Sequence, residues 1–120
     1  MRLRQFNPQE LIRRAREYLA RTPQEEVGLQ HAARAVGVAP SALALALRKS
    51  EGVGFHRYAL NFRLARAAEL LPTANDLTRL AHELGFSSHS HFSNAFHRWA
   101  GRTPSAFRAA ARKHGGVGLA

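Results

Sequence analysis

The chain has 120 residues, 45% of them hydrophobic, which is enough for one compact domain or two very small ones sharing a helix. Eighteen Lys and Arg against eight Asp and Glu give a formal charge of +10, which favours a polyanionic partner, although a merely soluble basic protein fits the charge equally well. The absence of Cys excludes disulfides and thiolate metal sites, and no apolar run is long enough to span a membrane. We therefore expect a soluble, cytoplasmic protein.

A capping pattern predicts the first helix. Asn7 is a good N-cap, Pro8 suits the first helical position, and Glu10 follows at the third. Thr22-Pro23 should end this helix, which we expect to support the fold without contributing chemistry. The expected buried stripe is Leu11, Ala15, Tyr18 and Leu19.

Two short helices joined by a tight turn are predicted twice. The first pair begins at Leu29, turns at Gly37 and ends near Gly52, while the second pair begins at Asp76 and turns at Gly85. Equivalent residues of the two helix pairs are separated by a nearly constant number of positions. Ala33, Val36, Gly37 and Val38 fall 48 positions before Ala81, Leu84, Gly85 and Phe86, and Leu43, Leu47, Gly52 and Tyr58 fall 49 positions before Phe92, Phe96, Gly101 and Phe107. The pattern indicates two helix-turn-helix units, with a one-residue insertion in the second turn.

A central helix is predicted between the units, from Phe55 to Leu71, and Pro72 should end it. Seventeen residues make a rod of roughly 25 Å, which would hold two recognition helices about one DNA turn (~34 Å) apart. Thr103-Pro104 predicts the start of a last helix. The expected fold is all-α with seven helices, divided into residues 1–52 (N-terminal helix and first unit), 53–72 (linker helix), 73–113 (second unit and C-terminal helix) and 114–120 (flexible tail).

The second unit carries a long motif, G-F-S-S-x-S-x-F-S-x-A-F, a basic pair and then G-x-T-P-S-x-F-R. Its residues are Gly85, Phe86, Ser87, Ser88, Ser90, Phe92, Ser93, Ala95, Phe96, His97, Arg98, Gly101, Thr103, Pro104, Ser105, Phe107 and Arg108. The linker adds Tyr58, Leu60, Asn61, Arg63, Leu64, Ala67, Leu70 and Leu71. Together these residues resemble AraC/XylS-type transcription regulators over nearly the whole chain.

The resemblance implies a bacterial protein that binds double-stranded DNA sequence-specifically, in the cytoplasm with the nucleoid, and often activates transcription by touching RNA polymerase. Many relatives carry a separate ligand-binding or dimerisation domain, and nothing in this chain can serve as one. We therefore expect either a free-standing monomer or the DNA-binding part of a longer protein, fused to or paired with an effector or dimerisation domain.

The second recognition helix should run from about His89 to Trp99. Spacing places Phe92, Ala95, Phe96 and Trp99 on its inner side, in the core. The outer side chains expected to meet base edges are His89, Ser90, Ser93 and Asn94. Those expected to contact phosphates are Ser88, His97, Arg98 and Arg102. Relatives often have Arg where this chain has Asn94, so we expect a preference for adenine over guanine. The alternative is that His89 and Asn94 are exposed to solvent and contact no base.

The first recognition helix is nearly bare of hydrogen-bonding groups. Its outward positions are Ser41, Ala44 and Leu45, of which the last two suit only thymine methyl groups, while Arg48 and Lys49 suit phosphates. We expect this unit to position the protein and the second unit to read most of the sequence. The alternatives are a protein-interaction or architectural module that binds DNA nonspecifically, and a decayed first unit that leaves a single half-site.

Catalysis and metal binding are not expected. His82, His89, His91 and His97 are close in sequence, but they lack the spacing of metal ligands on one helix face. No paired carboxylates, catalytic triad or phosphate-binding glycine loop is discernible. The sequence indicates a protein that is not an enzyme and needs no cofactor.

Overall fold

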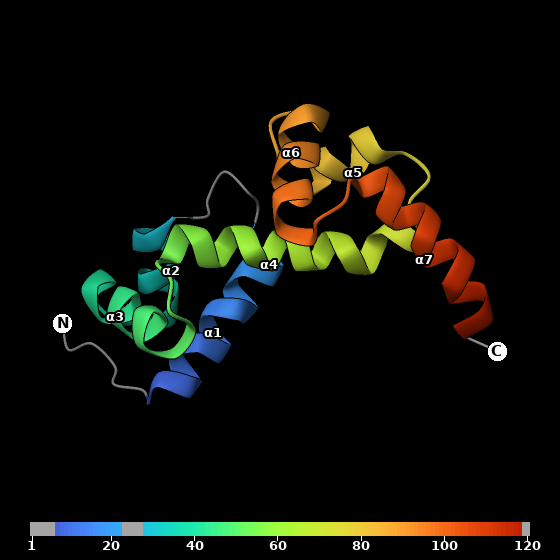
Figure 1. The fold of residues 1–120 in the computed structure, drawn as a ribbon. Helices are drawn as coiled ribbons and strands as arrows, with labels where there is room; N and C mark the ends of the chain where they lie inside the picture. Colours follow the sequence, from blue (N-terminus) through green and yellow to red (C-terminus); the bar gives the residue numbers. More distant parts are fainter. Residues whose placement is uncertain (1–6, 23–27, 119–120) are drawn as a thin grey trace. The chain divides into compact units, whose positions relative to one another are not determined.

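The computed structural model describes residues 7–22 and 28–118, with side chains up to Lys113. All regular secondary structure in these ranges is helical. The helices are α1 (Pro8–Arg21), α2 (Leu29–Val36), α3 (Pro40–Glu51), α4 (Phe55–Leu70), the 3-10 helix η2 (Leu71–Thr73), α5 (Leu77–Glu83), α6 (His89–Ala100) and α7 (Pro104–Gly118) (Figure 1). The seven α-helices confirm the predicted fold class. None of the described helices is both long enough and apolar enough to cross a bilayer.

The chain divides into two compact units, Met1–Phe62 and Arg63–Ala120. The boundary falls inside α4, so the first half of this helix belongs to one unit and the second half to the other. The sequence pattern had treated the linker helix as a segment separate from both units. The 3-10 turn that follows α4 contains Pro72 at a helix-start position, where its missing N–H costs no hydrogen bond.

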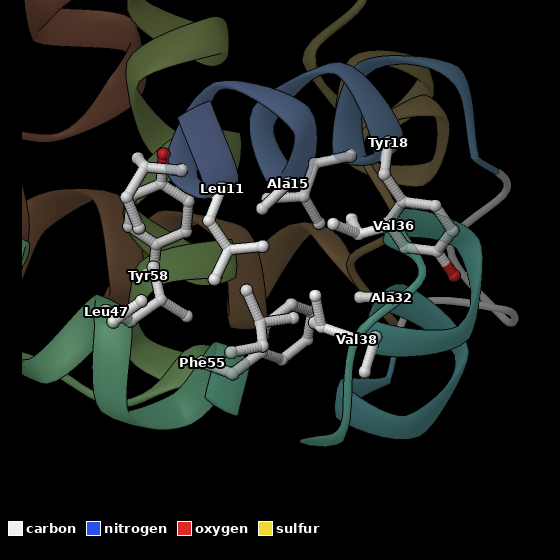
Figure 2. Close-up of a cluster of buried hydrophobic side chains, with 14 of the residues drawn as sticks. Leu11, Ala15, Tyr18, Ala32, Val36, Val38, Leu47, Phe55 and Tyr58 are labelled. Atoms are coloured by element: carbon white, nitrogen blue, oxygen red, sulfur yellow. The ribbon is translucent and has the colours of Figure 1, made fainter. Parts of the chain in front are cut away.

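The first unit is built on α1, α2, α3 and the start of α4. The Asn7 side chain accepts a hydrogen bond of 2.8 Å from the Glu10 N–H, which confirms the predicted N-cap of α1. Figure 2 shows apolar side chains from these four helices converging on one core. The buried residues are Leu11, Ile12, Ala15, Tyr18, Leu19, Ala32, Ala33, Val36, Val38, Leu43, Ala46, Leu47, Phe55, Tyr58 and Ala59. The predicted stripe of α1 is confirmed, and Ile12 joins it.

The second unit has an aromatic core. The rings of Phe86, Phe92 and Phe96 follow one another with centroids 5.2 and 5.8 Å apart, and Phe107 of α7 packs edge-on against Phe96 at 5.3 Å. Phe92 and Phe96 have no exposed surface. The other buried residues of this unit are Leu64, Ala67, Leu71, Leu80, Ala81 and Pro104.

The two helix-turn-helix turns share a left-handed glycine and one backbone hydrogen bond, as the repeat predicts. Gly37 and Gly85 have φ angles of 93° and 91°, in the left-handed region that glycine adopts without strain. In each turn the next residue, Val38 or Phe86, donates its N–H to the carbonyl five positions back, over 3.0 and 2.9 Å. The turns differ in the hydrogen bond of the glycine itself, because the Gly37 N–H donates to the carbonyl four positions back and the Gly85 N–H to the carbonyl three positions back. Both turns return an apolar side chain to the core.

Helix α7 is held to the chain around η2 by two arginines. Arg108 donates from Nη1 to the Ala74 carbonyl over 3.0 Å, and Arg112 donates to the carbonyls of Ala74 and Pro72, both over 2.9 Å. The Thr103 hydroxyl accepts from the Ala106 N–H over 3.2 Å, so the predicted cap of α7 is confirmed.

Helix α7 extends to Gly118 and so includes the glycine pair at 115–116, which belongs to the tail predicted from residue 114. The reason is that glycine weakens a helix without excluding helical dihedral angles, so a glycine pair marks a weak point and not an obligatory end.

Candidate nucleic-acid interface

Helix α6 is anchored by its N-cap and by its buried face. The Ser88 hydroxyl oxygen accepts a hydrogen bond from the His91 N–H over 3.0 Å, and the Asp76 carboxylate caps α5 in the same way from the Arg79 N–H over 3.1 Å. Phe92 and Phe96 lie wholly in the core, one turn apart. The orientation of α6 about its own axis is therefore fixed, and so is the set of side chains that it presents to solvent.

The outer face of α6 carries the polar side chains that were predicted to meet bases. His89, Ser90 and Asn94 are exposed, and Ser93 is half-buried. An amide, two hydroxyls and an imidazole thus share one helix, and each can both donate and accept hydrogen bonds.

Trp99 corrects one expectation. The pattern placed it on the inner side of α6, but 42% of its surface is exposed. Its ring packs on Phe96 with centroids 5.7 Å apart, and the rest of the indole projects from the last turn before Gly101. The side chain is too large to be covered at the end of the helix, which is usual for Trp. Ala95, also predicted to be inward, is half-buried.

Helix α3 presents a different outer face. Ser41 is exposed, Ala44 is half-buried, and Leu45 is 53% exposed. By the 49-residue repeat these positions correspond to Ser90, Ser93 and Asn94 of α6. The N-cap differs as well, because Ala39 stands where α6 has Ser88 and no side chain caps the helix.

The cations predicted to contact phosphates have no carboxylate partner among the described residues. Arg48, Lys49, Arg98 and Arg102 are exposed and make no ion pair there, and His97 is exposed beside Arg98. Other arginines of the chain are paired within their helices. These pairs are Arg13 with Glu10 and Glu17, Arg14 with Glu10, Arg66 with Glu69, and Arg79 with Glu83. The unpaired cations are therefore available to an external anion.

The histidines around α6 do not form a metal site. Within the described ranges, no three His, Cys, Asp or Glu side chains gather as metal ligands would. His91 instead contacts its own turn, with Nδ1 3.2 Å from the Ser87 hydroxyl and its ring edge-on to Phe86 at 5.4 Å.

Sequence reasoning assigned no contact to Arg63, which the structure places against the turn before α6. Its guanidinium lies 5.8 Å from the centroid of the Phe86 ring, and burial lowers the pKa of Arg63. The side chain is half-buried and makes no ion pair with a described residue. In the sequence, only the inclusion of Arg63 in the linker motif indicates that this arginine has a role.

Comparisons with known proteins give the same assignment as the geometry. A family model described as a helix-turn-helix domain matches residues 32–110. The HTH-type transcriptional regulator GlxA of Rhizobium meliloti (strain 1021) is 39% identical over 77 residues, which are 63% of this chain and 24% of that protein. The chain therefore spans about a quarter of the length of this curated relative.

Solved structures are similar over most of the chain. A transcriptional regulator from Chromobacterium violaceum, with an AraC-type DNA-binding domain, matches with a TM-score of 0.80 and 28% identity, covering 87% of this chain and 93% of that one. The DNA-binding domain of AdpA, solved in complex with a target DNA, shares the fold with a TM-score of 0.71 at 24% identity, covering 89% and 94%. These relatives are transcription regulators and not enzymes, as the sequence indicated. The matched residues span most of both helix-turn-helix units, and the chain belongs to the AraC-type family of helix-turn-helix transcription regulators.

Proposed function

We propose that this regulator binds DNA sequence-specifically by inserting α3 and α6 into adjacent major grooves, with α6 supplying most of the base readout. One observation carries this division of labour. Asn94 and Ser93 stand on the outer face of α6 where Leu45 and Ala44 stand on that of α3. Hydrogen-bonding side chains discriminate between base pairs better than aliphatic ones do.

Asn94 is the side chain best suited to base recognition. An exposed amide on a recognition helix can bond the N6 and N7 groups of adenine at once, a pairing that guanine does not satisfy. His89 and Ser90 lie in the first turn of α6, the part of a recognition helix that contacts base edges. We therefore expect an adenine in the half-site bound by α6.

Phosphate contacts would fix the register. Arg98 and Arg102 follow the base-reading residues of the second unit, and Arg48 and Lys49 follow those of the first. Ser88 accepts its capping hydrogen bond through oxygen, so its hydroxyl proton stays available to a phosphate. His97 would add a further contact. Since phosphate contacts release counterions, affinity should fall steeply with salt.

Partners beyond DNA follow from the family alone. We propose that the chain acts in transcription control by touching RNA polymerase. We also propose that, if it does not act as a monomer, it works fused to or paired with an effector or dimerisation domain. The AdpA domain of similar fold was solved on a target DNA, which supports the first step of this proposal, binding to duplex DNA.

Selection from a random duplex library tests the proposal, at two salt concentrations and with two variants. Asn94→Ala should lower affinity for the selected site by about 1–3 kcal/mol and relax the preference at one adenine. Asn75→Ala is the matched control, because this asparagine is also exposed but precedes α5 and lies outside both recognition helices. A selected site with two equally informative half-sites would contradict the unequal roles of α3 and α6.

The exposed Leu45 favours one alternative, a protein-interaction or architectural module with nonspecific DNA binding. The same selection separates the two functions. A regulator should prefer its site by about 10³-fold or more over random duplex. An interaction module should enrich no motif, and its DNA affinity should vanish as salt rises.

A further inference from the structure

Leu45 is an aliphatic side chain exposed near the centre of α3, the helix proposed to face DNA in the first unit. It is 53% exposed, and Trp99 is the only other large hydrophobic side chain so exposed in the described ranges. Leu43 and Leu47 of the same helix are wholly buried, so Leu45 is not needed to hold α3 against the core. An exposed leucine contributes favourable hydrophobic free energy only when a partner covers it.

The surroundings of Leu45 define what can cover it. Ser41 and Ala42 lie one turn before it and Arg48 and Lys49 one turn after it, at helical spacing, and all four are exposed. The spot combines a small apolar centre with the positive charges of Arg48 and Lys49, neither of which forms an ion pair with a described carboxylate. Its natural counterpart is a small apolar group set among negative charges.

The major groove of DNA offers this combination. The 5-methyl group of thymine is the apolar feature that a base pair presents there, and phosphates border the groove on both sides. The repeat places Leu45 at the position of Asn94, the residue of α6 proposed to read a base. A branched aliphatic side chain at that position has no hydrogen bond to offer, so a methyl group is the feature it can recognise.

We infer that Leu45 is a specificity-determining residue that reads the 5-methyl group of a pyrimidine in the half-site bound by α3. This inference rests on the proposed function. Thymine and 5-methylcytosine carry this methyl group at the same place in the groove, whereas uracil and unmodified cytosine lack it. The first unit therefore reads a methyl mark instead of a hydrogen-bonding pattern, and methylation of cytosine at this position raises affinity.

The expected effect of the methyl group on DNA affinity is small. Covering one methyl group should change affinity about fourfold, much less than the loss of a bidentate amide contact. Ala44 is half-buried and short, so truncation of Leu45 should remove the effect without a substitute from its neighbour.

The experiment uses the 120-residue chain and the duplex obtained by selection. Asn94→Ala first identifies the half-site of α6, and the other half-site belongs to α3. Each thymine of the α3 half-site is then changed singly to deoxyuridine, and binding is measured with the natural chain, Leu45→Ala and Leu45→Met. In a second series the critical thymine is replaced by cytosine or by 5-methylcytosine. Circular dichroism verifies that the variants keep their helix content.

The natural chain should lose about fourfold in affinity at one thymine and recover about the same factor when the methyl group is added to cytosine. Leu45→Ala should bind the thymine and uracil duplexes equally, while Leu45→Met should keep part of the difference. Equal affinity of the natural chain for all these duplexes, with specific binding retained, would overturn the inference and leave the proposed function standing. A thymine preference that persists in Leu45→Ala would also overturn it. Failure to select any site would overturn both.

Discussion

Helices α3 and α6 differ at the N-cap, and exchanging the caps should change the stability of the units in opposite directions. Ser88 stabilises α6 through one exposed hydrogen bond of 3.0 Å from the His91 N–H, so Ser88→Ala should cost about 1 kcal/mol in the free energy of unfolding. Ala39 occupies the equivalent place before α3, also with extended backbone, but has no side-chain acceptor. Ala39→Ser should add about 0.5 kcal/mol, less than the Ser88 cap, because the Ala42 N–H already donates to the Ala39 carbonyl over 3.0 Å.

Urea denaturation followed by circular dichroism, without DNA, measures both changes. The free energy of unfolding should fall in Ser88→Ala and rise in Ala39→Ser, with an unchanged dependence on urea concentration. Ser87→Ala serves as the control, because the adjacent hydroxyl is exposed and contacts the His91 ring but does not cap the helix. Loss of stability in Ala39→Ser, or a Ser87→Ala effect as large as that of Ser88→Ala, would refute the assignment of the caps.

Two further predictions concern α1 and α7. Hydrogen bonds from the Arg13 side chain hold the pKa of Glu10 below its ordinary value of 4.5. The ionised carboxylate therefore stabilises the folded state at pH values above the unfolded pKa, and this stabilisation is lost as the pH falls through the lower folded pKa. An NMR titration of the Glu10 carboxyl should give a value under 4.5 that returns towards 4.5 in Arg13→Ala; a value unchanged by that substitution contradicts the cause. Arg108→Ala should lower the free energy of unfolding by about 1 kcal/mol, because the Ala74 carbonyl loses one of its two charged donors and keeps that of Arg112. Urea denaturation checks it, with Arg98→Ala, an exposed arginine without such a contact, expected to have little effect.

The elements that could be predicted are those fixed by local chemistry. Asn7 and Thr103 each cap the helix that follows them, because an N-cap depends on residues three positions apart. The helix-turn-helix turns followed from glycine spacing for the same reason. Local patterns of this kind sufficed for the fold class and for most of the side chains that α3 and α6 expose.

The features that escaped prediction depend on parts of the chain distant in sequence. Arg108 and Arg112 contact carbonyls 34 to 40 residues away, which no periodicity reveals. Trp99 lies on the apolar stripe of α6, but its exposure depends on where the neighbouring helices stop covering that stripe. The choice of bases by His89 and Asn94 stays a prediction, because it depends on contacts with a partner that the fold does not contain.

The placement of the aromatic chromophores makes each unit separately observable. Trp99 is the only tryptophan of the chain and belongs to the second unit, while both tyrosines, Tyr18 and Tyr58, belong to the first. The indole is 42% exposed, and its ring packs at a tilt against Phe96. Its emission therefore reports the integrity of the second core, and tyrosine absorbance reports that of the first. A single unlabelled sample can thus show whether the two units melt as one cooperative block or in succession, and in which order.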